Sequence, residues 1–562
     1  MAEAGAAEPA CRSWWRDAVI YQIYLRSFAD GDNDGTGDLA GVRSRLQYLA
    51  DLGVDAIWFN PWYRSPMADG GYDVADYRQI DPSFGNLAEA EALIAEAAEL
   101  GIRTIIDIVP NHVSDQHPWF QQALADGQHS AARDRFWFRP GRGHAQNEAP
   151  NEWTSPFGGG TWTRTKNPDG TPGEWYLHLF APQQPDLNWN HPDVRAEHEA
   201  ILRFWFDRGA AGVRIDSAAL LVKDPGLSEV PADPVPGQHP YEDRDELHEI
   251  YRSWRAIAES YPDQRVLIGE LWLPDADRFA LYLRPDELHT AFNFDFLVCP
   301  WDERRLRHSI EATLAAHARV GAPATWVLSN HDVTRVVTRY GRADTSFSFA
   351  AKRHCVETDL VLGHRRARAA ALLAAALPGS LYIYQGDELG LPEVEDIPTD
   401  QLTDPMYFRS GGQDPGRDGC RVPLPWSGAT PPYGFSTGEQ AAPSWLAQPS
   451  SWARLTVQAQ LDEPASMLSM YRQALRIRRN EPDLRDTTLR WIEAGPGVLS
   501  FGRGQSFGCL VNLSDRPIEL PAHRAVLLTS AALTPTGQLP MDAAAWLRLG
   551  SGSSVPDAGN GG

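Results

Sequence analysis

Three acidic residues stand at the ends of short apolar runs, where their types and spacing could support acetal chemistry. Asp216 ends AGVRID, Glu270 ends RVLIGE, and Asp332 follows TWVLSN by two residues. Three carboxylates in one pocket repel one another, so the grouping costs stability unless a reaction uses it. Acetal cleavage uses it, because one carboxylate attacks the anomeric carbon while a second, protonated one donates its proton to the leaving oxygen. Arg214 lies on the same side of the predicted strand as Asp216 and would keep that carboxylate ionised.

Each of these residues has a plainer interpretation when it is taken singly. An acidic residue at a strand end is more often a helix cap or a salt-bridge partner. His112 or His331 alone would more often be a packed or surface histidine. The recurrence of polar residues at successive strand ends favours a functional site.

Eight apolar runs predict the elements that must position these residues. Most of the runs lack period-2 alternation, which is typical of strands buried on both faces of a parallel sheet. Helical patterns lie between them: apolar residues recur at three- and four-residue steps from Leu39 to Leu52 after an N-cap at Asp38, and Asn86 with Glu89 forms a capping-box pattern. The alternation predicts a (β/α)8 TIM barrel, whose active sites lie at the C-terminal ends of the strands. The runs are residues 19–25, 56–61, 104–110, 211–216, 265–270, 291–296, 325–330 and 380–386.

Uneven spacing between the runs predicts the domain organisation. We expect the barrel in two parts, 14–106 and 179–486, around an inserted small domain at 107–178 that is rich in aromatic residues and glycine. A Pro-rich segment at 228–240 and a long loop or subdomain at 391–450 follow the fourth and eighth strands. Short β runs predict a C-terminal antiparallel β domain at 487–548, and a Gly- and Ser-rich tail at 549–562 is expected to be disordered.

Bulk composition excludes several classes of protein. The formal net charge of −23 over 562 residues disfavours nucleic acid and anionic membranes as partners. Five widely spaced cysteines without a CxxC motif indicate neither a disulfide framework nor a zinc site. No leader pattern or long apolar run is present, so we expect a cytoplasmic protein without a membrane span. The sequence carries no signal for an oligomeric state.

Four segments resemble the signature motifs of the α-amylase family of glycoside hydrolases (family 13). They are DIVPNH (107–112), GVRID (212–216), GEL (269–271) and SNHD (329–332), and QPDLN (184–188) resembles the oligo-1,6-glucosidase and α-glucosidase branch. The resemblance implies that Asp216 is the nucleophile, Glu270 the general acid/base, and Asp332 the carboxylate that stabilises the transition state. It also implies that His112, Arg214 and His331 bind the central sugar and that anomeric configuration is retained, which requires carboxyls about 5 Å apart.

The resemblance further predicts the kind of substrate, a small oligosaccharide. Asp69 and Tyr72 match residues that bind the terminal glucose in exo-acting relatives, and Arg417 matches the partner of that Asp; a weak surface salt bridge is the equal alternative. Ser217, directly after the nucleophile, favours α-1,4 links in maltose and short α-glucosides. The alternatives are an oligo-1,6-glucosidase and a glucosyltransferase or isomerase that rearranges trehalose or sucrose. A non-enzymatic relative is disfavoured because all three carboxylates are kept.

The segment DGDNDGTGD predicts a structural Ca²⁺ site. Carboxylates alternate along it and a threonine carbonyl is available, which is the oxygen-rich pattern that Ca²⁺ prefers. The alternative is a solvated acidic turn, and no organic cofactor is expected. The expected ligands are Asp30, Asp32, Asp34, Thr36 and Asp38.

Overall fold

A computed structural model of the chain describes residues 13–167, 169–438 and 441–550. At its centre is an eight-stranded parallel sheet in the order β11-β10-β9-β5-β2-β1-β13-β12. The Thr325 hydroxyl links the two end strands, since it donates to the Ala291 carbonyl at 2.6 Å and accepts the Asn293 N–H at 3.1 Å. The sheet is therefore a nearly closed (β/α)8 barrel, as the sequence predicts. Its strands are β1 (Val19–Ile23), β2 (Ala56–Phe59), β5 (Arg103–Ile108), β9 (Gly212–Ile215), β10 (Val266–Gly269), β11 (Thr290–Ala291), β12 (Thr325–Val327) and β13 (Ser380–Tyr384).

The barrel interior explains why these runs are apolar without alternation. Every residue of β1, β2, β9, β10 and β13 is buried, because one face meets the interior and the other meets the surrounding helices. Aromatic rings fill part of the interior: Phe292 lies 5.1 Å from Trp58 and 4.6 Å from Tyr382 between ring centroids. Such packing leaves only the strand ends open to ligands.

Helices surround the barrel, and their starts follow the predicted caps. Asn86 and Glu89 form a reciprocal capping box, and Asp38 caps the helix that begins at Leu39. The pattern from Leu39 to Leu52 predicted one continuous helix, and this prediction is wrong. The helix is interrupted at Ser44 and Arg45, so the segment forms two short helices. The helices are α1 (Leu39–Arg43), α2 (Leu46–Leu52), α3 (Leu87–Glu99), α4 (Pro118–Ala125), α5 (Pro192–Phe206), α6 (His248–Glu259), α7 (Ala276–Leu281), α8 (Phe294–Val298), α9 (Glu303–Val320), α10 (Val336–Tyr340), α11 (Leu360–Ala376), α12 (Pro405–Arg409), α13 (Val457–Leu461) and α14 (Met467–Asn480).

The sixth apolar run departs from the prediction. The run 291–296 was expected to be a strand, but β11 covers only Thr290–Ala291 and α8 begins at Phe294. The Asn293 side chain accepts the Phe296 N–H and so caps this helix. Because Phe and Leu are buried in either conformation, the apolar run alone does not distinguish them.

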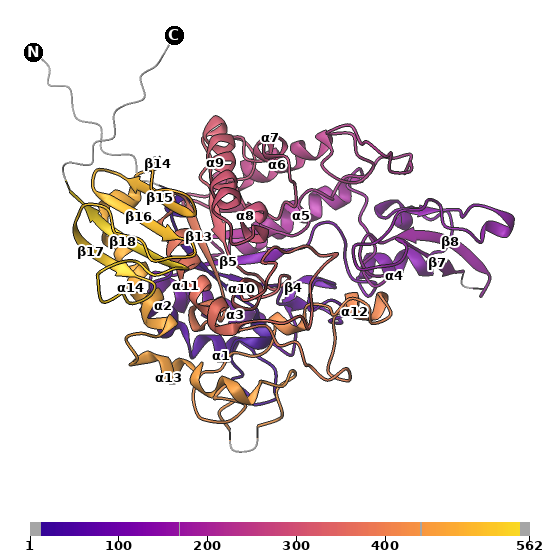
Figure 1. Cartoon of the computed structure of the whole chain (residues 1–562). Coiled ribbons are helices and arrows are strands. Elements are labelled where there is room, and N and C mark those ends of the chain that lie inside the picture. The colour runs from indigo at the N-terminus through magenta and orange to yellow at the C-terminus, as the bar shows by residue number, and fades with distance from the viewer. Residues whose placement is uncertain (1–12, 168, 439–440, 551–562) are drawn as a thin grey trace, which may run out of the picture.

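Two small sheets flank the barrel at opposite ends of the molecule (Figure 1). Within 107–178, β6 (Phe138–Arg139), β8 (Pro172–Leu177) and β7 (Trp162–Lys166) form a three-stranded antiparallel sheet. A short antiparallel pair, β3 (Tyr63–Arg64) and β4 (Asp76–Ile80), follows β2. The C-terminal antiparallel sheet has the order β14-β15-β16-β18-β17, with β14 (Arg490–Trp491), β15 (Val498–Arg503), β16 (Phe507–Asn512), β18 (Ala543–Leu549) and β17 (His523–Thr529).

The C-terminal sheet contains one strand that the sequence pattern misses. Among the short β runs expected in 487–548, IELP (518–521) contributes only an isolated bridge between Ile518 and Leu539, whereas the Ala-rich segment 543–549 forms β18 at an inner position. Small side chains suit this position because β18 packs on α11, where the Trp546 indole donates to the Leu372 carbonyl at 3.1 Å. Most of the predicted tail, 551–562, lies outside the described residues.

Candidate active site

A cavity of about 490 Å³ opens at the C-terminal ends of the barrel strands. All three predicted catalytic carboxylates line it: Asp216 follows β9, Glu270 follows β10, and Asp332 follows β12. The side chains of Asp216 and Glu270 are only 11% and 10% exposed. The fold therefore gathers the three acidic groups around one space large enough for a sugar.

Arg214 and Ser217 hold Asp216 and Glu270 as a pair. The Arg214 guanidinium contacts Asp216 Oδ1 at 2.6 Å through Nη1 and Glu270 Oε2 at 2.8 Å through Nη2. Ser217 adopts a left-handed backbone conformation (φ 47°), and its N–H donates to Glu270 Oε2 at 2.8 Å while its hydroxyl donates to Asp216 Oδ2 at 2.9 Å. Both carboxylates are thus fixed by the buried Arg214 and by Ser217 at the cavity surface.

The two carboxyls have different proton affinities. Burial raises the pKa of Asp216 to about 6 against the opposing effect of Arg214. Burial raises the pKa of Glu270 to about 7, and the charges of Asp216 and Asp332 add to this rise against Arg214. Near pH 6.5, roughly midway between these values, an ionised Asp216 beside a protonated Glu270 is the favoured arrangement.

Asp332 stays ionised because two arginines contact it. Asp332 Oδ1 lies 3.0 Å from both Arg417 Nη1 and Arg421 Nη2. Burial alone would raise the pKa of Asp332, but His331 and these two arginines hold it well below its usual range. Burial also lowers the pKa of His331, which lies 3.2 Å from Asp332 Oδ2 and stacks on Tyr72 at 5.3 Å between centroids.

The predicted contact between Asp69 and Arg417 is present and is buried. Arg417 Nη2 lies 2.6 Å from Asp69 Oδ1, and the two side chains are only 7% and 4% exposed, so this is not a surface pair. Arg417 also contacts Asp404 Oδ2 at 2.6 Å through Nε. Asp69, Tyr72 and Arg417 line the cavity and form a wall on one side of it.

Comparison with models of protein families identifies the family to which this chain belongs. The family described as "Alpha amylase, catalytic domain" matches residues 22–487. The chain belongs to the α-amylase family of glycoside hydrolases.

This glycoside hydrolase is similar over most of its length to α-glucosidases. It is 36% identical to the "Probable alpha-glucosidase" of Rhizobium meliloti (strain 1021), with 91% of this chain and 92% of the relative covered. It is 32% identical to the oligo-1,6-glucosidase of Parageobacillus thermoglucosidasius, with coverage of 91% and 93%. Among solved structures, the α-glucosyl transfer enzyme XgtA superposes with a TM-score of 0.81 at 33% identity, covering 96% of this chain and 100% of that one.

Two predicted sugar ligands of the glycoside hydrolase lie behind the cavity wall. Among the described residues that line the cavity, Ser217, Asp69, Tyr72, His331 and Arg417 are present, but His112 and Arg214 are not. His112 Nε2 lies 3.0 Å from both the Tyr72 carbonyl and Gln184 Nε2, and burial lowers its pKa to about 4.

Sequence reasoning missed several residues that organise the site. Asp107 pairs with Arg214 at 3.0 Å and accepts the Tyr72 hydroxyl at 3.0 Å; its place in DIVPNH was the available signal. Asp404 and Arg421 lie in the long segment after β13, where no periodic pattern marks them. Trp272, whose indole N–H donates to Glu270 Oε1 at 3.0 Å, had no sequence signal.

The acidic segment after β1 brings only part of the predicted ligand set together. The carboxylate oxygens of Asp30, Asp32 and Asp38 lie within 4.8 Å of one another. Asp34 is not in this group, and its carboxylate instead accepts the Thr36 N–H at 2.7 Å. Asp38 also accepts the Gly31 and Asp32 N–H groups, so it serves the loop as well as its helix. Three convergent carboxylates fit a cation, because oxygen ligands are those that Ca²⁺ prefers.

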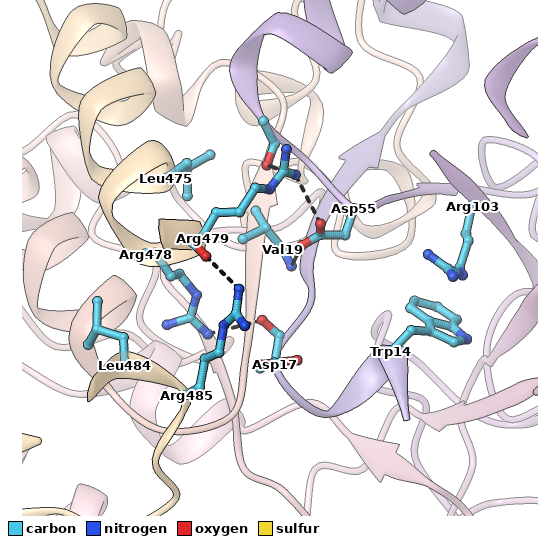
Figure 2. A pocket seen from close by; sticks show the side chains of 11 residues that line it. Trp14, Asp17, Val19, Asp55, Arg103, Leu475, Arg478, Arg479, Leu484 and Arg485 are labelled. Carbon is cyan, nitrogen blue, oxygen red and sulfur yellow. Dashed lines mark hydrogen bonds and ion pairs between the residues drawn. The ribbon is translucent and has the colours of Figure 1, made fainter. Parts of the chain in front are cut away.

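A second cavity, of about 300 Å³, lies at the opposite end of the barrel (Figure 2). It is lined by Val19 and Arg103, at the starts of β1 and β5, and by arginines of α14 and the turn after it. Two of its arginines make contacts within the protein: Arg479 contacts Asp55 at 3.0 Å, and Arg478 donates to backbone carbonyls such as that of Ala375. Residues at the N-terminal end of such a barrel generally serve the stability of the fold.

No helix among the described residues is long and apolar enough to span a membrane.

Proposed function

We propose that the protein is a retaining, exo-acting α-glucosidase that releases glucose from the non-reducing end of maltose and short α-glucosides, with a preference for α-1,4 links. The observation that carries this proposal is the pair of carboxyls, Asp216 and Glu270, held by one guanidinium beside the ionised Asp332. The family shows the class of reaction, and the geometry supports these roles.

In the proposed reaction, an Asp216 oxygen attacks the anomeric carbon as the glycosidic bond breaks. Glu270 gives its proton to the departing oxygen, which leaves as a hydroxyl, and a glucosyl ester remains on Asp216. Glu270, now ionised, then takes a proton from water as that water attacks the same carbon and frees Asp216. Asp332 stabilises positive charge that develops on the sugar ring in both steps.

The wall formed by Asp69, Tyr72 and Arg417 supports action on chain ends. Asp69 and Arg417 derive from the segments after β2 and β13, which flank β1, and their buried ion pair forms part of the cavity lining there. Tyr241, Glu242 and Trp272 line the cavity from the segments after β9 and β10, across the barrel mouth. The leaving sugar is therefore placed against this second group.

The position of Glu242 at the cavity favours a neutral leaving sugar over a negatively charged one. Its carboxylate lines the cavity, and no cationic partner contacts it among the described residues. Burial, followed by the charge of Asp243, raises the pKa of Glu242, so added negative charge is unfavourable there. Phosphorylated disaccharides are expected to be poor substrates.

Product analysis tests the proposal. Purified protein is incubated with maltose, isomaltose and sucrose, and products are separated by anion-exchange chromatography. Release of glucose, fastest from maltose, is expected, and glucose released from an aryl α-glucoside should first appear as the α-anomer by proton NMR. Initial release of the β-anomer from the aryl glucoside would contradict the retaining assignment, and faster cleavage of isomaltose than of maltose would contradict the α-1,4 preference.

A second candidate function is glucosyl transfer to a sugar acceptor. Trp272, Phe349 and Tyr241 give the acceptor side of the cavity aromatic faces on which a sugar can stack in place of water. The similarity to a glucosyl transfer enzyme also favours it. At high maltose concentration, trisaccharide formed in amounts close to those of free glucose would establish transfer as the main activity, and a new disaccharide formed in excess of free glucose would establish isomerisation.

We also propose Ca²⁺ as a structural ion in the acidic segment after β1. The convergence of Asp30, Asp32 and Asp38 supports it, since Asp30 and Asp38 are buried acidic groups. Ca²⁺ added to chelator-treated protein should raise the melting temperature, and Asp32→Asn should reduce this shift. An equal shift in the variant would contradict the site.

A further inference from the structure

Every donor that contacts Glu270 is fixed at a known oxygen. Among the described residues, Oε2 accepts the Ser217 N–H at 2.8 Å and lies 2.8 Å from Nη2 of the Arg214 guanidinium, with which it forms an ion pair. Oε1 accepts the Trp272 indole N–H at 3.0 Å. The cation and one N–H therefore lie at Oε2, whereas a single N–H lies at Oε1.

This pattern leaves one place for the transferable proton. A proton on Oε2 would lie against the Arg214 cation and the Ser217 N–H, whereas Oε1 meets one N–H and keeps room for a proton. Since that one N–H belongs to Trp272, the indole restricts the direction in which the proton can point. We infer that Trp272 is a positioning residue that aims the Glu270 proton at the leaving oxygen; this inference rests on the proposed glycosidase function.

The indole is held firmly enough to do this. Its ring stacks on Phe294 with centroids 3.8 Å apart and planes 6° apart, and it meets Phe349 edge-on at 5.0 Å. Phe294 is itself buried at the start of α8. The indole edge therefore points at Glu270 while its neighbours fix the plane of the ring.

The test compares substrates that need the proton with one that does not. Trp272→Phe keeps an aromatic ring on Phe294 but removes the N–H. The specificity constant kcat/KM is measured for maltose and for 2,4-dinitrophenyl α-glucoside, because it reports only the steps through the first bond cleavage. We expect it to fall about 10- to 100-fold for maltose and by less than about threefold for the aryl glucoside, whose leaving group departs without protonation.

A pH profile separates positioning from a merely structural role. The indole N–H favours the ionised form of Glu270, so its removal should raise the pKa of that group and move the alkaline limb of kcat/KM to higher pH. Phe294→Leu loosens the indole but keeps its N–H, and it should show the same substrate dependence in weaker form.

An equal loss on both substrates in Trp272→Phe, or an unmoved alkaline limb, would overturn the inference. If Trp272→Phe does not fold, the maltose-to-aryl-glucoside ratio of Phe294→Leu decides, and an unchanged ratio overturns the inference. The proposed function is tested separately, because it requires only that the unmodified protein cleave maltose.

Discussion

Arg417 offers the sharpest test of how the site is stabilised. Its guanidinium contacts three carboxylates, the buried Asp69 and Asp404 at 2.6 Å and the cavity-lining Asp332 at 3.0 Å. Replacing it by Met keeps the apolar stem but leaves Asp69 and Asp404 without their main cation. Asp332 keeps Arg421.

The loss of folding free energy expected in Arg417→Met follows from the change in pKa of the carboxyl groups that Arg417 contacts. Burial alone would raise the pKa of Asp404, and Arg417 holds it below its usual range, so the pair contributes stability above the unfolded pKa of about 3.9 that is lost as pH falls. In Arg417→Met an orphaned carboxyl must fold protonated, which costs about 4 kcal/mol at pH 7 and about 1.5 kcal/mol at pH 5. Breaking a buried ion pair typically costs about 3–5 kcal/mol, which agrees with this figure.

Urea denaturation at the two pH values measures this cost. Arg417→Met should lower the free energy of unfolding by at least about 3 kcal/mol at pH 7 and by clearly less at pH 5. The matched control is Arg307→Met, because Arg307 pairs with Glu311 on the exposed face of α9 at 3.0 Å and should cost less than about 1 kcal/mol at either pH. A loss in Arg417→Met that equals the control, or that does not change between pH 7 and pH 5, would refute the reasoning.

Three further predictions concern the reaction. Asp216→Asn should lower turnover by several orders of magnitude while leaving the fold intact, and near-normal turnover in a clean preparation would count against a nucleophilic role. The pH profile of kcat/KM should be bell-shaped, rising as Asp216 ionises near pH 6 and falling as Glu270 loses its proton near pH 7; an optimum above pH 8 would contradict the assigned roles. Glu242→Gln should improve cleavage of a phosphorylated disaccharide relative to maltose, and an unchanged ratio would show that this carboxylate does not face the leaving sugar.

Local sequence patterns predicted most of the barrel but not all of its elements. The runs that became β1, β2, β5, β9, β10, β12 and β13 are apolar over several consecutive residues, and burial on both faces explains that composition. The pattern failed at 291–296, where a cap at Asn293 starts a helix, and at 543–549, where alanines form a strand. In both places packing against neighbours overrides the local preference.

The sequence by itself determined which carboxylates are the candidates for the reaction, because Asp216, Glu270 and Asp332 each follow a recognisable apolar run. Only the tertiary structure decided how they are charged and aimed. Asp69 and Arg417 are 348 residues apart along the chain, and Trp272 reaches Glu270 only because its ring packs on Phe294. Electrostatic and hydrogen-bonding partners are chosen by distance in space, which spacing along the chain does not encode once loops of unequal length connect the strands.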